Sequence, residues 1–310
     1  MNDLAIYYHS PQQTKQYNHL LNQSLFFPLV TFMYEHREER IILRQLKAAF
    51  ATEAKLEQFL SEMIDCQLII RENRQYRLNF PIYTAAEVAS LPLAEDELPK
   101  FKGTVTEQLF WLAESFWPQV FPEEEDYFFG VSGGLTFYQK QRLASAQLSI
   151  ITLEKEKTEV PTMPRYFDYL GKEQSLPEAF SALYDLLGDV NPEYYLSQAR
   201  RVIKQALRGR KVSTVPNIFQ ESLHLTQVIT IDQDHLKLLL PVATEQAEPL
   251  EAQSNILAFY YEKIANRSAI ERLVFMQQLI EQLGTNSLSC LLYTSPSPRD
   301  RTRSRMPSSA

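Results

Sequence analysis

The spacing of apolar residues changes twice within residues 41–84. After a short strand-like pair, Ile41 and Ile42, apolar side chains recur at helical spacing through Leu43, Leu46 and Phe50. Thr52 can cap a second helix. The apolar stripe of this second helix consists of Leu56, Phe59, Leu60, Met63 and Ile64. The sequence therefore predicts a short strand followed by two helices.

From Leu68 onward the apolar period falls to two. Tyr76 and Leu78 alternate with polar residues, and a polar run from Glu72 to Gln75 separates two strand-like segments. These features predict a β-hairpin with one buried face. Two helices followed by a hairpin is the order of a winged helix, and the apolar residues 25–33 can supply its first helix.

The hairpin pattern returns in the second half of the chain. Residues 228–244 align with residues 68–84 without a gap, at an offset of 160 residues. Ile229 matches Ile69, Leu238 matches Leu78 and Pro241 matches Pro81. Similarity at a fixed offset indicates two copies of one unit, although two amphipathic hairpins that end in proline can also look alike. We therefore predict an α+β fold that is mostly helical, with tandem winged-helix-like units and β-hairpin wings.

Composition divides the chain into four predicted segments. Residues 1–90 form the first winged-helix-like unit, and residues 91–160 contain an acidic linker, a buried aromatic helix around Trp111 and Trp117, and a mixed segment. Residues 161–284 form the second unit with C-terminal helices. Residues 285–310 are rich in Ser, Pro and Arg and resemble translated sequencing-adapter sequence, so we expect a disordered, non-native tail. Its four Arg and one Asp contribute +3, so the net charge of −7 becomes −10 without it.

Several protein classes are disfavoured by composition. No apolar run approaches the roughly 18 residues of a membrane helix, and the N-terminus lacks the pattern of a signal peptide. The two cysteines, Cys66 and Cys290, have no metal-ligand spacing and provide no disulfide framework. We expect a cytoplasmic protein without a membrane segment, a metal site or a cofactor.

Nucleic-acid binding is suggested by the predicted topology, because a winged helix usually places its second turn-motif helix in the major groove. That helix carries Glu53, Glu57, Glu62 and Asp65 against Lys55 alone, which would oppose phosphate. The candidate nucleic-acid or anion contacts lie on the first hairpin and near residue 200: Arg71, Arg74, Arg77, Arg200, Arg201, Lys204, Arg208, Arg210 and Lys211. Solvated surface charge, or cations that complement a helix C-terminus, would explain the same residues.

A catalytic interpretation rests on residues 130–134, which read G-x-S-x-G with Ser132 at the centre. A nucleophile elbow needs a strand before the serine, a helix after it, and an acid and a histidine later in the chain. Asp185 or Asp189 with His224 or His235 would complete such a triad. No glycine-rich oxyanion loop precedes the serine, so a flexible loop explains the motif better and we predict no catalytic residue.

The string LRQLKAAF at residues 43–50, followed by LIIRENRQYRLNFP at residues 68–81, resembles the bacterial domain-of-unknown-function family eighteen-oh-three of lactic-acid bacteria and their relatives. The resemblance is good from about residue 25 to residue 82. It implies a cytoplasmic Gram-positive protein whose module occurs in one or two copies, and it brings no established activity, ligand or catalytic residue. We expect a non-enzymatic regulatory or scaffolding module that binds an unknown protein partner. A DNA-binding transcriptional regulator is the alternative, and a serine hydrolase using Ser132 is a remote one.

Overall fold

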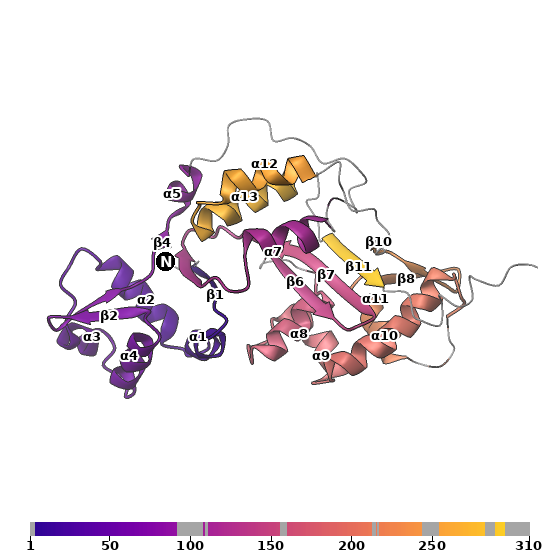
Figure 1. Ribbon diagram of the computed structural model, residues 1–310. Helices are drawn as coiled ribbons and strands as arrows, with labels where there is room; N and C mark the ends of the chain where they lie inside the picture. Colours follow the sequence, from indigo (N-terminus) through magenta and orange to yellow (C-terminus); the bar gives the residue numbers. More distant parts are fainter. Residues whose placement is uncertain are drawn as a thin grey trace, which may run out of the picture. The chain divides into compact units, whose positions relative to one another are not determined.

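The computed structural model describes residues 4–91, 108, 111–155, 160–212, 215, 217–243, 254–282 and 289–294. The chain forms two compact units, each assembled from separate stretches of sequence (Figure 1). The first unit contains Met1–Leu93, Phe121–Thr136 and Arg267–Val274, and the second contains Ala94–Val120, Phe137–Asn266 and Phe275–Ala310. Helices predominate and the strands form small sheets, which confirms the predicted α+β class. Residues 91–160, which form one predicted segment, contribute to both units.

The first unit begins with a strand and continues through four helices into the hairpin. Its elements are β1 (Ala5–His9), α1 (Thr14–Leu21), α2 (Phe26–Glu35), α3 (Leu43–Ala49), α4 (Leu56–Asp65), β2 (Ile69–Glu72), β3 (Gln75–Leu78), β4 (Ile82–Tyr83), α5 (Ala85–Ala89) and β5 (Tyr127–Val131). Strand β5 lies between β1, with which it pairs antiparallel, and β4, with which it pairs parallel. The N-terminal strand β1 and helix α1 have no counterpart in the predictions from sequence.

The predicted helices and hairpin of this unit are present. Leu56, Phe59, Leu60 and Met63 are buried on one side of α4, and Ile42 forms a single β-bridge to Gln75 of the hairpin. One detail of the prediction is wrong. Helix α4 starts at Leu56 after Lys55, so Thr52 does not cap it.

The second unit builds its core around a four-stranded sheet. Its elements are a π-helix η1 (Leu112–Phe116), α7 (Trp117–Val120), β6 (Tyr138–Ala144), β7 (Leu148–Lys155), α8 (Met163–Gly171), a 3₁₀-helix η2 (Glu178–Phe180), α9 (Ser181–Leu187), α10 (Pro192–Leu207), α11 (Ile218–Leu225), β8 (Ile229–Asp232), β9 (His235–Leu238), β10 (Val242–Ala243), α12 (Ser254–Ile264), α13 (Ala269–Gln282), which the division into units splits after Val274, and β11 (Ser289–Thr294).

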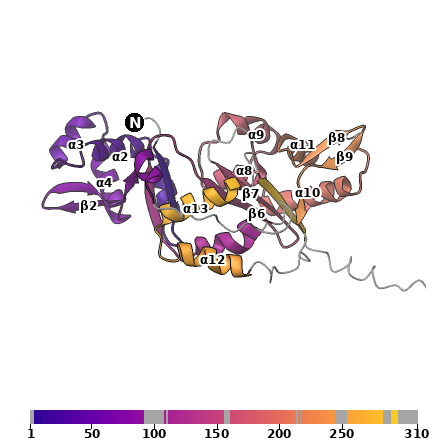
Figure 2. The ribbon, with the colours of Figure 1, turned by 90° about the horizontal axis from the view of Figure 1, so that it is seen from above.

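The sheet of the second unit has the order β10-β11-β7-β6. Every residue of β7 from Leu148 to Glu154 is buried, because η1 packs against this strand and α8 contacts β6 and β7 from the other face (Figure 1). Figure 2 shows the hairpin β8–β9 beside α10 and α11. The predicted aromatic helix around Trp111 and Trp117 corresponds to η1 and α7, in which Leu112, Phe116 and Val120 are buried.

The two hairpins repeat one structure at the offset of 160 residues. The bounds of β8, β9 and β10 lie 160 residues after those of β2, β3 and β4. Each residue from 66 to 79 is buried, half-buried or exposed as its counterpart among residues 226–239 is. Both two-residue turns have positive φ, at Asn73 and Arg74 and again at Gln233 and Asp234. We call residues 58–83 the first repeat and residues 218–243 the second repeat.

The resemblance between the units extends to their sheets. In each unit the strand after the hairpin pairs parallel with a later strand, and that later strand pairs antiparallel with a strand that precedes the hairpin: β4, β5 and β1 in one unit, and β10, β11 and β7 in the other. The strand β11 lies in residues 285–310, which the sequence predicts to be a disordered tail. The structure describes only residues 289–294 of that tail, and the prediction that it is non-native stays a prediction.

The units differ at the first turn-motif helix. In the first unit α3 follows the bridge at Ile42, whereas the bridge between Lys211 and His235 leads to α11 after a short connection. The described part of that connection, residues 212, 215 and 217, contains no helix. The counterparts of the buried Leu60 and the half-buried Ile64 in α4 are the polar residues Gln220, which is half-buried, and His224, which is exposed.

Candidate functional site

Four aliphatic side chains are exposed on α11, on the hairpin β8–β9 and directly after it. Ile218, Leu225, Ile231 and Leu239 are exposed at 44%, 37%, 44% and 52% of their surface. Their counterparts in the first repeat are also exposed, but all four are polar: Gln58, Asp65, Arg71 and Asn79. At these four positions the exposure is therefore the same in both repeats, while a polar side chain in the first repeat is replaced by an aliphatic one in the second.

Two of these aliphatic residues share one side of a helix. Ile218 and Leu225 are seven positions apart in α11, which places them two turns apart on the same side. Asn217 starts this helix by accepting hydrogen bonds from the amides of Phe219 and Gln220. Leu239 lies beside the turn that ends α11, because its amide donates to the carbonyl of Val228. We call Ile218, Leu225 and Leu239 the aliphatic patch.

Exposed apolar side chains are concentrated in this part of the chain. Ten large hydrophobic side chains are exposed among the described residues, and seven of them lie between Tyr194 and Leu239. A soluble protein normally scatters such residues singly over its surface, and a concentration of them marks an interaction surface. The sequence alignment at offset 160 carried this signal, because it sets each of the four aliphatic residues against a polar one.

The corresponding surface of the first repeat is satisfied by its own polar contacts. Gln58 donates to Glu62 at 2.9 Å, and Asn79 donates to the carbonyl of Gln67 at 2.8 Å. The guanidinium of Arg71 lies 5.4 Å from the ring centre of Tyr76. These contacts hold the side chains of Gln58, Asn79 and Arg71 against the protein. The three side chains are polar and present no apolar area to a partner.

The predicted basic residues of the first hairpin are exposed. Arg71 and Arg77 lie on its strands, and Arg74 occupies the turn with φ of 64°. Arg77 lies 3.8 Å from Glu72, so part of the hairpin's positive charge is balanced locally. The acids of α4 are partly paired too, since Glu57 forms an ion pair with Lys47 at 2.5 Å.

The predicted basic residues of the second unit lie on α10 and directly after it. Arg201, Arg208, Arg210 and Lys211 are exposed, whereas Arg200 and Lys204 are half-buried. The Nε and Nη2 atoms of Arg200 are buried and have no hydrogen-bond partner. The carbonyl of Arg210 accepts from the amide of Leu236, which ties this segment to the hairpin. The nine predicted contacts thus divide between the two units, and their role in nucleic-acid or anion binding stays a prediction.

Ser132 follows strand β5, as a nucleophile elbow requires, but no helix follows it. The chain passes from Ser132 through Gly133 and Gly134 into strand β6 of the other unit. Ser132 is 5% exposed, and its hydroxyl and amide both donate to the carbonyl of Tyr83, at 3.4 and 2.8 Å. Packing explains the glycine at position 130, because a Cβ there would lie 3.0 Å from the side chain of Ile82 and 3.1 Å from that of Leu4.

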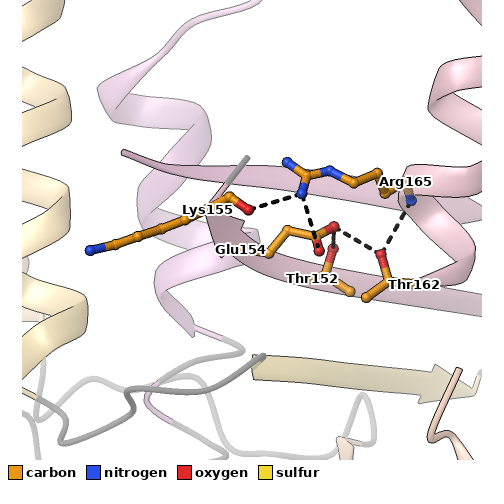
Figure 3. A network of polar contacts seen from close by, with 5 residues as sticks. All are labelled: Thr152, Glu154, Lys155, Thr162 and Arg165. Carbon is orange, nitrogen blue, oxygen red and sulfur yellow. Dashed lines mark hydrogen bonds and ion pairs between the residues drawn. The ribbon is translucent and has the colours of Figure 1, made fainter. Parts of the chain in front are cut away.

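A buried polar network joins the end of β7 to the start of α8 (Figure 3). Glu154, 1% exposed, accepts hydrogen bonds through Oε1 from the hydroxyls of Thr152 at 3.0 Å and Thr162 at 2.8 Å. Its Oε2 lies 3.8 Å from Nη1 of Arg165, which also donates to the carbonyl of Lys155 at 2.9 Å. Burial raises the pKa of Glu154, and Arg165 and the two threonines oppose that rise only in part. The network is closed to solvent and fixes α8 on the sheet. Thr162 also caps α8.

Neither metal binding nor membrane insertion gains support from the described residues. Within them, no three side chains of the types His, Cys, Asp or Glu come together in a way that could hold a metal ion. None of the helices in the described ranges is both long and apolar enough to cross a membrane.

Comparison with known proteins gives one match. Neither the curated proteins nor the solved structures include one that matches the chain. The one match is to a family model and ends before the second repeat. It includes residues 43–50 and 68–81 and confirms the resemblance seen there. A family model described as a domain of unknown function (DUF1803) matches residues 5–110.

Proposed function

We propose that this chain is a cytoplasmic, non-enzymatic regulatory or scaffolding protein that binds a protein partner through two winged-helix-like repeats. The observation that carries the proposal is the aliphatic patch of the second repeat. Ile218, Leu225 and Leu239 are exposed at positions where the first repeat has Gln58, Asp65 and Asn79. When a partner covers exposed apolar side chains, the free energy falls by roughly 25 cal/mol for each Å² of apolar surface removed from water.

The helix order supports the winged-helix-like interpretation. In the first unit a helix, a bridging residue, two helices and a hairpin follow one another, and the bridge pairs with the hairpin. The surface that would read DNA in such a domain carries the acids of α4 in the first repeat and aliphatic side chains in the second. Both chemistries favour a protein partner over a phosphate backbone.

A double substitution tests this function. Ile218→Gln with Leu225→Asp gives α11 the residues that α4 carries at the same positions, so the fold has a precedent within the chain. Tyr184→Gln, at an exposed tyrosine of α9, is the matched control. We expect the full chain and the control to cross-link to the same protein of the native cytosol, and the double variant to lose that protein. Equal recovery by all three would contradict the proposal.

DNA binding is the second candidate, and the basic residues of α10 favour it. Arg200, Lys204 and Arg208 follow one another at intervals of four on one side of the helix, and Arg200 keeps two buried nitrogens without an acceptor. Fluorescence anisotropy of the full chain with mixed duplex DNA, from low salt to about 200 mM, separates the candidates because phosphate contacts give a steep salt dependence. Binding with that dependence, lost on changing these three residues to Glu, would replace the protein-partner proposal.

A serine hydrolase using Ser132 would require Ser132→Ala to abolish an esterase activity.

A further inference from the structure

One edge of the Arg200 guanidinium in α10 is unsatisfied. Its Nε and Nη2 atoms are shielded from solvent, and among the described residues neither has a hydrogen-bond partner. These two nitrogens lie on the same edge of the planar group, where their N–H bonds run parallel. That edge matches the two oxygens of a carboxylate or of a phosphate group. Because a buried charge without a partner is costly, this edge indicates an anionic ligand.

The segment around Arg200 has a large excess of positive charge. Residues 194–220 contain six Lys and Arg and no Asp or Glu. This segment therefore carries +6, and since the whole chain has a net charge of −7, the remaining residues carry −13. The segment itself provides no anion for Arg200. Its charge favours the approach of a negatively charged group from a partner.

The side of α10 that carries Arg200 also exposes an aliphatic side chain. Arg200, Lys204 and Leu207 follow at intervals of four and three residues, so they share one side of the helix. Leu207 is 51% exposed, and the two cations are half-buried. We call these three residues the α10 strip. The phosphate backbone of a nucleic acid offers no apolar surface to cover Leu207, so the strip favours a protein segment.

A ligand can reach the unsatisfied edge through movement of the Arg200 side chain. The residue as a whole is half-buried and lies at the border of the core side of α10, next to the buried Ala199. Arginine packs its apolar stem on the protein while its guanidinium reaches the surface. Rotation between staggered conformers therefore turns the edge toward a partner without displacement of the helix.

We propose that the α10 strip binds an acidic segment of the protein partner. A carboxylate of that segment accepts hydrogen bonds from Nε and Nη2 of Arg200, and an apolar side chain beside it covers Leu207. The inference rests on the proposed function, because it specifies the chemistry of the partner. It involves none of the residues of the aliphatic patch.

The probe is a fluorescent peptide of about 12 residues composed of Glu, Leu and Gly, which in extended form is longer than the strip. A peptide with Gln in place of each Glu is the control. Fluorescence anisotropy of the full chain is measured at about 150 mM salt, where exposed charges are screened. We expect the Glu peptide to bind at least about tenfold more tightly than the Gln peptide, because the Arg200 contact is a charge-assisted pair of hydrogen bonds.

Substitutions at Arg200 test the shape of the contact as well as its charge. Arg200→Gln should weaken binding of the Glu peptide at least about tenfold, and Arg200→Lys almost as much, because an ammonium group has no edge with two parallel N–H bonds. Arg201→Gln is the matched control, since it removes the same charge from the next position. It should change binding less than about threefold, as expected for an exposed cation.

The stability of the free chain gives a second measurement. Arg200→Gln removes a charge that has no partner among the described residues, so its urea midpoint should be no lower than that of the unmodified chain. A clearly lower midpoint would show that Arg200 supports the fold, and would overturn the inference.

Equal binding of the Glu and Gln peptides, or equal losses from Arg200→Gln and Arg201→Gln, would also overturn it. Mixed duplex DNA or inorganic phosphate that displaces the Glu peptide and binds more tightly would overturn it in favour of a nucleic-acid or phosphate site. The Ile218→Gln, Leu225→Asp variant should bind the Glu peptide as the unmodified chain does. If that variant loses its cross-linked partner while no chain binds the peptide, the proposed function stands and this inference alone is wrong.

Discussion

Gln67 and Gln227 hold the same left-handed backbone conformation at equivalent positions of the two repeats, with φ of 59° and 55°. The amide of Gln67 donates to the carbonyl of Ile64 and the amide of Leu68 to that of Met63, which together form a Schellman motif at the end of α4. The same two hydrogen bonds recur from Gln227 to His224 and from Val228 to Leu223 at the end of α11. The repeats therefore share the backbone strain of this helix end as well as the hairpin that follows it.

Glycine at either of these positions should stabilise the protein. A left-handed conformation strains a residue with a Cβ, and glycine adopts it freely, so we expect Gln67→Gly and Gln227→Gly each to raise the free energy of unfolding by about 0.5–1 kcal/mol. Urea denaturation measures this change. Gln75→Gly, in the strand β3, is the control and should lower stability. Destabilisation by both helix-end substitutions would show that the glutamine side chains matter more than the backbone.

Gly130 should be required for packing in the first unit. A Cβ at this position meets Ile82 and Leu4 at 3.0 and 3.1 Å, so Gly130→Ala overpacks the strand β5 and should cost about 1–3 kcal/mol. Gly171 at the end of α8 has open space around it, and Gly171→Ala should be neutral or stabilising by up to about 1 kcal/mol. Thermal unfolding of the two variants checks the contrast. A neutral Gly130→Ala would remove the packing explanation of the G-x-S-x-G motif.

The local elements of this fold were predictable because their signals are local. The apolar stripe from Leu56 to Met63 and the alternation around Tyr76 specify α4 and the hairpin, and the offset of 160 residues locates the second hairpin. Strand β1 was missed, since AIYYH is short and the pairing that stabilises it comes from β5, more than a hundred residues away. The addition of Phe121–Thr136 and Arg267–Val274 to the first unit also depends on contacts between segments that are distant in sequence, and no local pattern indicates it.

The candidate surface was only partly predictable. Basic residues are visible in a sequence, so the nine candidate contacts were found, but sequence cannot say that they divide between two units. The sequence alone would assign Ile218 and Leu225 to the buried side of an amphipathic helix, because apolar residues usually face inward. The burial of Leu223, at 0%, and the exposure of Leu225, at 37%, distinguish the inward side from the outward one, and the alignment at offset 160 agrees by placing Leu225 opposite Asp65.

The Glu154–Arg165 pair should couple β7 to α8. Both side chains are almost completely buried, so removal of Arg165 leaves the Glu154 carboxyl group without its cation and should cost about 3–5 kcal/mol. We expect Arg165→Met to show this loss in urea denaturation, and Glu154→Gln to cost less, because burial already favours the neutral form of this carboxyl group. The double variant should lose less than the sum, because it leaves no unpaired charge. Additive losses would indicate that the two residues act independently.

The same carboxyl group should make stability depend on pH. Burial raises the pKa of Glu154 above its usual value of 4.5, so the folded chain holds this proton more tightly than the unfolded chain does. The contribution of Glu154 to the free energy of unfolding is therefore greatest below the unfolded value and falls as the pH rises through the folded pKa. Glu154→Gln cannot titrate, so its stability should fall less over that range. Parallel pH profiles of the two proteins would contradict the raised pKa.

Stability measurements should separate the aliphatic patch from the core beneath it. Ile218 and Leu225 are exposed, so Ile218→Gln with Leu225→Asp should change the free energy of unfolding by no more than about 0.5 kcal/mol per site. Leu223 lies between them in sequence but is fully buried, and Leu223→Ala should cost about 2–5 kcal/mol, as should Met63→Ala at the equivalent position of the first repeat. Urea denaturation of the three variants measures both effects. A large loss in the double variant would mean that Ile218 and Leu225 support the fold, and the patch could then not be assigned to a partner. A small loss, with Leu223→Ala strongly destabilised, leaves the outward side of α11 without a structural role in the free chain.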